Sequence, residues 1–172
     1  MVDTPAGLGD ISTATGARIF IGPVALPLVD TQAEFAALTP YLEIGMVESV
    51  GEFGDEANKV TPSPLGQARV RKAKGVADAG SSRLPSVYHD PLDAGQAAMI
   101  ACAEPLYRKK RAFKVILRDA PDEANYTNTA IYFRGLVMSR RRNVGGADNV
   151  LRITFNIEID SNLAEVLAAL LP

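Results

Sequence analysis

The chain has 172 residues, 47% of them hydrophobic and 22% charged, so it can build one folded domain around a buried core. Its net charge of −2 argues against a dedicated nucleic-acid-binding protein. The single Cys102 excludes an internal disulfide, and its apolar surroundings predict a buried packing residue in a reducing cytoplasm. The longest early apolar run, residues 19–29, contains two prolines and is far too short to span a membrane, so no membrane association is expected.

The first part of the chain predicts a flexible arm followed by short elements. Residues 1–16 are polar and lack the regions of a secretory signal, which favours a flexible N-terminal arm. Strands are expected at residues 18–21 and, from the alternation of apolar residues, at residues 42–46. Between them, Thr31 and Glu34 have the spacing of a capping box and predict a short helix.

The middle of the chain predicts the one well-defined helix, over residues 91–104. Asp90 is expected to cap it, Pro91 to occupy its first position, and Pro105 to end it. A strand at about residues 83–89 is expected at a sheet edge, because Pro85 lacks a backbone donor. Alternating apolar residues at 113, 115 and 117 indicate a further strand after the helix.

The last third of the chain predicts a long antiparallel hairpin over residues 129–160, with its turn at residues 143–149. In the second strand the apolar residues share one face and the polar residues the other. The apolar spacing over residues 161–172 predicts a C-terminal amphipathic helix that packs on the sheet or docks on a partner. The apolar face of the second strand comprises Leu151, Ile153, Phe155, Ile157 and Ile159, and its polar face comprises Arg152, Thr154, Asn156, Glu158 and Asp160. The apolar residues of the predicted C-terminal helix are Leu163, Val166, Leu167, Leu170 and Leu171.

Strands therefore outnumber helices and do not alternate regularly with them. This pattern predicts a mainly β (α+β) protein with an antiparallel β-sandwich or barrel-like fold. One helix should flank the sheet, short helices should lie towards the chain ends, and residues 17–160 should form a single domain.

No catalytic, metal or cofactor site can be assembled from the residue types present. His89 is the only histidine and precedes the predicted helix cap, so a structural or surface role is expected. One histidine and one cysteine cannot provide a zinc site, and the phosphate-binding and dinucleotide-binding glycine motifs are absent. We therefore expect no enzyme activity and no cofactor.

The most unusual segment is GEFGDEANKVTPSPLGQARVRKAKG, at the start of a long loop over residues 51–80. It begins with acidic residues and ends with basic ones, with prolines and glycines between them, and a connection of this length is uncommon in a compact domain. It is either a floppy insertion or a segment that becomes ordered on a neighbouring subunit. Head-to-tail contacts of the second kind generate rings or filaments.

Three basic clusters keep nucleic-acid recognition open as an alternative. Any one of them could contact phosphates, but each lies next to a turn, where solvated or subunit-facing charge is the simpler interpretation. The clusters are Arg69, Arg71, Lys72 and Lys74; Arg108, Lys109, Lys110 and Arg111; and Arg140, Arg141 and Arg142.

Three stretches together resemble the major tail tube proteins of long-tailed, siphophage-type bacteriophages and prophages. They are YLEIGMVESVGEFGDEANKVTPSPLGQARVRKAKG, DPLDAGQAAMIACAE and YFRGLVMSRRRNVGGADNVLRITFNIEID, and the likeness runs from about residue 31 to residue 160. No single stretch is diagnostic, but their order and spacing make the resemblance fairly specific. Secretion-system tube proteins share this fold.

The resemblance implies a virion subunit that forms homohexameric rings stacked into a hollow tube for DNA ejection, assembled in the cytoplasm of the host bacterium. Its implied partners are copies of itself, a tape-measure protein in the lumen, a tail terminator, a distal tail protein and, transiently, viral DNA. The implied ring-stacking residues are Phe53, Asp55, Glu56, Lys59, Arg69, Arg71, Lys72 and Lys74. Those expected to line or flank the tube wall are Arg140, Arg141, Arg142, Arg152, Thr154, Asn156 and Glu158.

Overall fold

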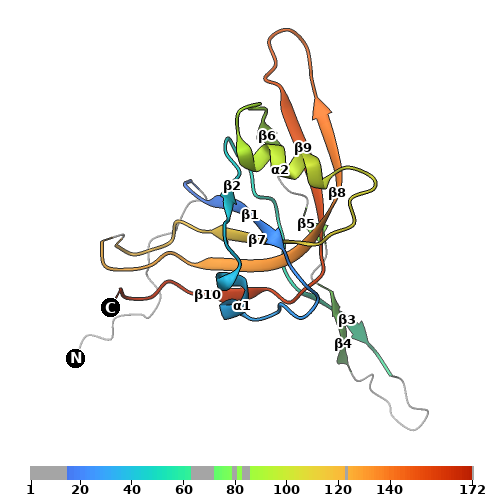
Figure 1. Ribbon diagram of the computed structural model, residues 1–172. Coiled ribbons are helices and arrows are strands. Elements are labelled where there is room, and N and C mark those ends of the chain that lie inside the picture. The colour runs from blue at the N-terminus through green and yellow to red at the C-terminus, as the bar shows by residue number, and fades with distance from the viewer. Residues whose placement is uncertain (1–14, 63–71, 79–80, 83–85, 123, 172) are drawn as a thin grey trace.

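The computed structural model describes residues 15–62, 72–78, 81–82, 86–122 and 124–171. Its main feature is an eight-stranded antiparallel sheet in the order β2-β1-β7-β8-β9-β5, with β10 paired to β8 and β6 paired to β9 (Figure 1). The sheet curls into a half-barrel, which confirms the predicted mainly β class. The elements are β1 (Arg18–Val24), α1 (Gln32–Ala37), β2 (Leu42–Glu43), β3 (Glu56–Val60), β4 (Ala73–Asp78), β5 (Ser81–Ser82), β6 (Ser86–Tyr88), α2 (Ala94–Cys102), β7 (Arg111–Ile116), β8 (Ala130–Asn143), β9 (Arg152–Ile159) and β10 (Ala164–Val166).

The long strand β8 organises the sheet because it changes partners along its length. Residues 130–135 pair with β7, and residues 135–143 pair with β9. Gly135 lies at the changeover, where a Cβ atom would come within 2.5 Å of Ile157 Cγ2, so a larger residue does not fit. A register shift between Val137 and Ser139 places a bulge just beyond it. β8 bends in this region, and α2 lies inside the bend (Figure 1).

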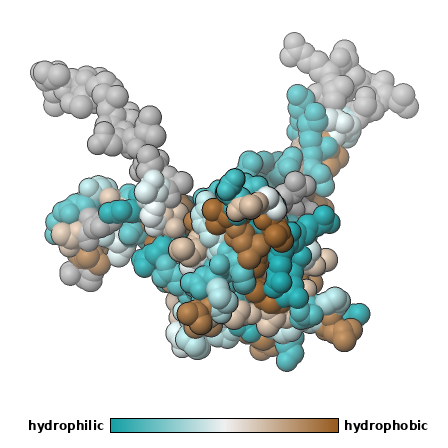
Figure 2. Space-filling view, turned by 90° about the horizontal axis from the view of Figure 1, so that it is seen from above, coloured by the Kyte–Doolittle hydropathy of each residue, from teal (hydrophilic) through white to brown (hydrophobic). Residues whose placement is uncertain are grey.

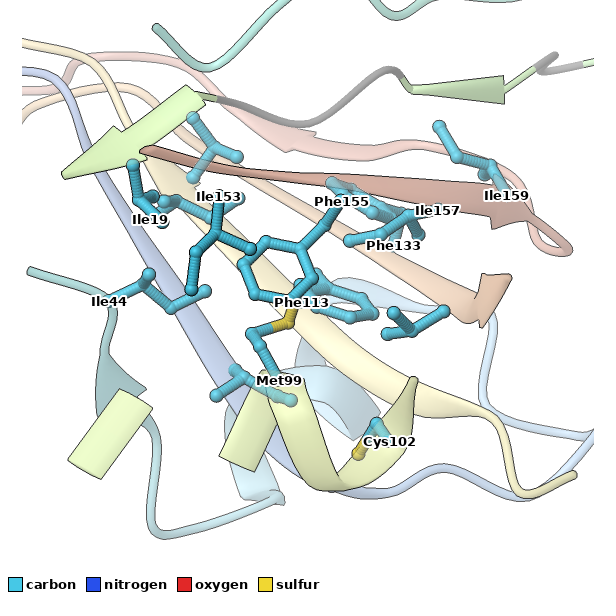
Figure 3. Packing of buried hydrophobic residues seen from close by; sticks show 14 residues of the cluster. Ile19, Ile44, Met99, Cys102, Phe113, Phe133, Ile153, Phe155, Ile157 and Ile159 are labelled. Carbon is cyan, nitrogen blue, oxygen red and sulfur yellow. The ribbon is translucent and has the colours of Figure 1, made fainter. Parts of the chain in front are cut away.

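The principal core lies between the sheet and α2. Alternate side chains of β1, β7, β8 and β9 point into it, and Phe113 and Phe133 stack at its centre with ring centroids 5.3 Å apart. Met99 and Cys102 of α2 close it from the other side (Figure 3). Cys102 is 3% exposed, as its apolar surroundings predicted.

A smaller core on the opposite face of the sheet is covered by α1. The predicted capping box is present, since the Thr31 hydroxyl accepts the Glu34 N–H and the Glu34 carboxylate accepts the Thr31 N–H. The cap orients α1 so that Phe35 stacks on Tyr132. Tyr41 donates its hydroxyl to the Phe35 carbonyl at 2.8 Å, and burial, together with Tyr132, raises the pKa of Tyr41 to about 12.

The predicted hairpin is confirmed as β8 and β9, and the alternation in β9 has the expected consequence. Ile153, Phe155, Ile157 and Ile159 are buried, whereas the residues between them are exposed or half-buried.

Helix α2 is shorter than predicted, and its cap is different. Asp93, not Asp90, is the N-cap, and its Oδ1 accepts the Gln96 N–H at 2.6 Å. Asp90 Oδ1 instead accepts the Leu92 N–H and closes a turn before the helix. The prediction that Pro91 begins the helix is therefore wrong.

The predicted C-terminal helix over residues 161–172 is also wrong. Residues Ala164–Val166 form β10, which pairs with residues 130–132 of β8, on the same edge as β9 but along the part of that edge that β9 does not reach. Hydrogen bonding to β8 outweighs the helical spacing of the leucines, a tertiary effect that no local pattern reveals. Leu163 and Val166 still pack against the two cores, whereas Leu167 and Leu170 stay exposed at 68% and 66%, so the predicted stripe does not pack on the sheet as one face.

Two other expected segments differ from the prediction. The strand at residues 42–46 ends after Glu43, since Met46 has a φ of 57°, which is incompatible with an extended strand. The long loop over residues 51–80 contains the paired strands β3 and β4. β6 fits the edge strand expected near residue 86 and pairs with β9.

Candidate subunit interface

Strands β3 and β4 form a two-stranded ribbon that projects from the body of the protein (Figure 1). The view from above shows the ribbon as an arm clear of the body (Figure 2). Among the described residues, neither strand pairs with the main sheet. An isolated two-stranded hairpin is only marginally stable in water, so this ribbon is a candidate for contact with another molecule.

The ribbon has two chemically different faces. Lys59 pairs with Lys74 and Ala57 with Ala77, so these four side chains share one face. Val60 pairs with Ala73 on the other face. A register shift places Val76 on that second face too, and Val76 is 80% exposed. One face therefore carries Lys59 and Lys74. The other, the apolar face, exposes both valines beside Asn58, with Glu56 at its base, and no layer of the described residues covers it.

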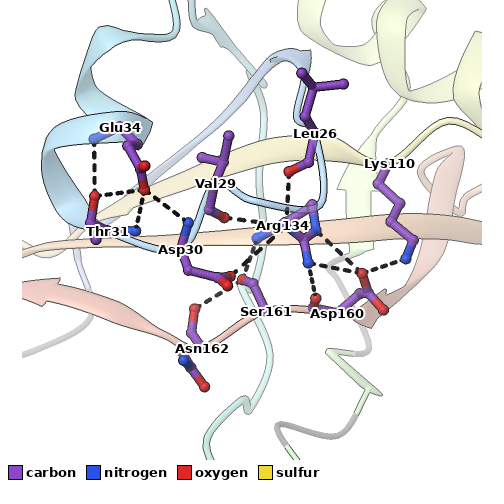
Figure 4. Close-up of polar contacts among 10 residues, drawn as sticks. All are labelled: Leu26, Val29, Asp30, Thr31, Glu34, Lys110, Arg134, Asp160, Ser161 and Asn162. Carbon is purple, nitrogen blue, oxygen red and sulfur yellow. Dashed lines mark hydrogen bonds and ion pairs between the residues drawn. The ribbon is translucent and has the colours of Figure 1, made fainter.

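The base of the ribbon adjoins a buried arginine that the sequence analysis missed. Arg134 is 5% exposed, and its guanidinium donates to the backbone oxygens of Leu26 and Asp160 at 2.9 and 2.6 Å (Figure 4). It also pairs with the Asp160 carboxylate at 3.1 Å. The only sequence signal was an arginine inside the apolar run AIYFRGLV.

Asp160 joins two cations at this site. A hydrogen bond from Lys110, followed by the charges of Lys110 and Arg134, holds the pKa of the Asp160 carboxyl below its usual range despite partial burial. A pocket of about 350 Å³ is lined by Asp160, Arg134 and two residues of the ribbon base, Asp55 and Ala77. The pocket therefore lies between the Arg134–Asp160 ion pair and the base of the ribbon.

A second group missed by the sequence analysis fixes α2 to the chain that leads towards the ribbon. Gln96 is fully buried, and its amide donates to the carbonyls of Gly45 and Tyr88 at 3.0 and 2.9 Å. Asp93 Oδ2 accepts the Gly45 N–H at 3.0 Å. The DAGQ sequence carries both residues, and Gly95 between them allows α2 to approach the Glu43 carbonyl, which a Cβ atom would reach at 2.1 Å.

Of the residues predicted for ring stacking, Phe53 lies within the protomer, where its ring packs on Phe133 with centroids 5.8 Å apart. Phe53 also lines a groove of about 730 Å³ between residues 15–17, 47–53 and 115–119. The ribbon brings the exposed side chains of Lys59 and Lys74 together on one face, whereas Glu56, also exposed, lies on the other. Asp55 and Lys72 flank it, whereas Arg69 and Arg71 lie outside the described residues.

The three arginines predicted at the tube wall do not form one cluster. Because β8 is extended, Arg140 and Arg142 share a face with Phe155 and Ile153, whereas Arg141 points to the opposite face. Arg140 pairs with Glu104 at 3.0 Å, next to the end of α2.

The polar residues predicted at the tube wall share the outer face of β9. Thr154 is exposed, and Asn156 donates to Glu158 at 3.2 Å. Arg152 lies over the Tyr88 ring at 5.3 Å and pairs with Glu48 at 3.1 Å. Hydrogen bonding to Tyr88 and the charge of Glu48 raise the pKa of Arg152. Because Arg152 and Glu158 both lie on it, this face carries both signs of charge.

The only histidine takes part in a backbone contact of the fold. His89 is half-buried and donates its backbone N–H to Leu151 at 3.0 Å. No group of three or more potential metal-ligating side chains occurs among the described residues. In the same residues, neither helix has the length and apolarity needed to cross a membrane.

No protein-family model and no curated protein matches the sequence. Solved structures do match. With a chain from the 6-fold symmetrised anti-feeding prophage (AFP) baseplate the TM-score is 0.70 at 7% identity, over 93% of this chain and 98% of that chain. The SPP1 tail tube gives a TM-score of 0.62 at 13% identity, over 90% of this chain and 78% of that chain. The PVC sheath/tube terminator of an extracellular contractile injection system gives a TM-score of 0.62 at 11% identity, over 93% of this chain and 99% of that chain. The chain thus has the tail-tube-like fold found in phage tails and contractile injection systems.

Proposed function

We propose that the chain is a structural subunit of a phage-type tail tube, which assembles with copies of itself into rings that stack into a conduit for DNA. The observation that carries this proposal is the match to the SPP1 tail tube over 90% of this chain. The ribbon adds support, because a projecting two-stranded element with an uncovered apolar face is explained most simply by a neighbouring subunit.

Ring formation is supported by open strand edges. β7 pairs with one edge of β8 only as far as Gly135. Beyond that residue, none of the described strands pairs with the same edge. Unpaired strand edges tend to pair with other chains unless they are covered, and closing them around a ring removes the edge. We infer that such edges join copies into a ring, for which six copies are the expected number.

Ring stacking is assigned to the ribbon. Its cationic end, with Lys59, Lys72 and Lys74, is expected to meet acidic groups of the next ring, with Asp55 and Glu56 at its base. We place the outer face of β9 and Arg141 at the tube wall, and a tape-measure protein followed by DNA in the lumen.

A related function is a tube or tube-end component of a contractile injection system. The matches to the anti-feeding prophage baseplate and the PVC terminator favour it as strongly as the SPP1 match favours a siphophage tail. The two differ in assembly, since a tail tube subunit polymerises to indefinite length, whereas a tube-end protein stops at one ring.

A nucleic-acid-binding module receives less support. Lys110, Arg140 and Arg152 pair with Asp160, Glu104 and Glu48 within the protomer. Arg140 and Arg141 also point to opposite faces of β8, so they cannot contact one stretch of phosphates together. Weak, non-specific DNA binding is the expected result of a titration at two salt concentrations.

The proposal is tested by negative-stain electron microscopy of the purified chain over a range of concentrations. We expect rings and hollow tubes from the full chain. A variant in which a short glycine linker replaces residues 57–77 should keep the thermal unfolding midpoint and form rings without tubes. A full chain that stays monomeric throughout would refute the proposal, and long tubes from the shortened variant would refute only the role of the ribbon.

A further inference from the structure

We propose that the apolar face of the β3–β4 ribbon docks into the 730 Å³ groove of a second copy of this chain in the neighbouring ring. This inference rests on the proposed tube function and names the receiving site, which the stacking role of the ribbon leaves open.

The groove has an apolar floor and a charged rim. Its floor is formed by Val47, Val50, Phe53, Val115 and Leu117, which also belong to the principal core or pack against it. Its rim carries two carboxylates, Glu48 and Asp119, and one guanidinium, Arg118. The floor is therefore a firm apolar surface that is continuous with the core yet open to a neighbour.

The ribbon has the matching properties. Val60 and Val76 are 49% and 80% exposed and lie on one face, where nothing in the described protomer covers them. The outer part of the described ribbon, residues 57–62 and 72–77, carries three lysines, whereas its base carries the acidic residues Glu56 and Asp78. Valines can thus enter the groove while a long lysine side chain at the ribbon end or edge reaches the Asp119 carboxylate on the rim.

Charge sets the direction of the contact. Glu48 pairs with Arg152 within its own protomer at 3.1 Å, so the attraction of the ribbon lysines comes mainly from Asp119, while Arg118 opposes it, and only some registers of the ribbon are favourable. The ribbon lysines are exposed and Asp119 is half-buried, so salt weakens this attraction, whereas it does not weaken the burial of the valines. Moderate salt should therefore slow stacking without abolishing it.

The groove is also linked to the ribbon of the receiving copy. One groove wall, residues 47–53, runs directly into β3, which begins at Glu56. Phe53 lines the groove and packs on Phe133, so a docked ribbon would hold the segment from which the next ribbon projects. This linkage provides a physical route by which the addition of one ring prepares the addition of the next.

The test is disulfide cross-linking between two singly substituted chains, Val76→Cys on the ribbon and Ser49→Cys on the groove rim. Ser49 is exposed, so its replacement should leave the fold intact, and the native Cys102 is only 3% exposed and contributes little background. The two variants are mixed, assembled and oxidised, and linked peptides are identified by mass spectrometry. The matched control pairs Val76→Cys with Thr154→Cys, which is exposed on the outer face of β9.

We expect the 76–49 link to exceed the 76–154 link several-fold in tubes and to disappear in unassembled protein. Tubes with equal yields of the two links, or without the 76–49 link, would overturn the groove assignment and leave the tube function standing. Failure of the full chain to form rings or tubes would overturn the proposed function and this inference together.

A second pair of variants tests the groove without relying on cysteine chemistry. Ser49→Trp places a bulky side chain at the groove, and Thr154→Trp is its matched control. We expect Ser49→Trp to form rings that do not stack and Thr154→Trp to form tubes, with unchanged thermal midpoints in both. Normal tubes from Ser49→Trp would contradict the proposal.

Discussion

The β8–β9 hairpin and the β3–β4 ribbon are both antiparallel pairs with a register shift, yet only the first has a buried face. In β9, four alternate apolar side chains are buried against the sheet and α2. In the ribbon, Val60 and Val76 are exposed, and Lys59 lies directly opposite Lys74. Strand pairing therefore does not determine stability here, because the decisive factor is whether another layer covers the apolar face.

This difference suggests a division of tasks between the two hairpins. The β8–β9 hairpin should determine whether the protomer folds, and the ribbon whether protomers assemble. Substitutions in the first should lower the free energy of unfolding, while substitutions in the second should change assembly alone.

The largest effect is expected for Phe133→Ala in β8. Phe133 is 1% exposed and contacts both Phe113 and Phe53, so its removal leaves a cavity where the core meets the chain leading to the ribbon. The free energy of unfolding should fall by about 3–5 kcal/mol, as measured by denaturant titration. A change of the same size for Val76→Ala would contradict the comparison between the two hairpins.

A smaller loss is expected for Gln96→Met, which keeps the approximate side-chain size. It leaves the carbonyls of Gly45 and Tyr88 and the Asp90 N–H without their partner, which should lower the free energy of unfolding by about 2 kcal/mol. Gln32→Met, on the exposed side of α1, is the control and should change it by less than about 0.5 kcal/mol. Equal effects of the two variants would show that the Gln96 bonds do not hold α2 in place.

Acid should remove part of the stability supplied by Asp160. Its pKa is lowered in the folded protein by Lys110 and Arg134, so the folded state binds fewer protons than the unfolded state below about pH 4. Stability is therefore lost as the pH falls through that window. In thermal unfolding, Asp160→Asn should have a lower midpoint than the wild type at pH 7, and this gap between the two midpoints should be smaller at pH 3. A gap that stays constant with pH would exclude this contribution.

The smallest effect on stability is expected for Val76→Asp on the ribbon. Val76 is 80% exposed, so the free energy of unfolding should change by less than about 0.5 kcal/mol. Stacking should nevertheless be lost, since a carboxylate would enter an apolar contact, and electron microscopy should show rings without tubes. Leu92→Asp, at a position outside the ribbon that is 93% exposed, is the control. Tubes of normal length from Val76→Asp would assign stacking to another surface.

Much of the fold could be predicted because its signals are local. The alternation in β9 identified the buried face correctly, and the Thr31 and Glu34 pair identified the start of α1, since both patterns depend on neighbours two to four residues away. The unusual composition of residues 51–80 also marked the ribbon region. The C-terminal strand was missed because its partner, β8, lies about thirty residues away.

For the candidate interface, the sequence by itself determined which segment stands out and which charges it carries. Only the tertiary structure decided that Val60 and Val76 share an uncovered face, that Arg140 and Arg141 diverge, and that Phe53 faces inward. It also brought three distant segments together as a groove and buried Arg134 beside Asp160. The physical reason is that face, burial and charge pairing depend on strand register and on contacts between residues far apart in the chain, which no local pattern encodes.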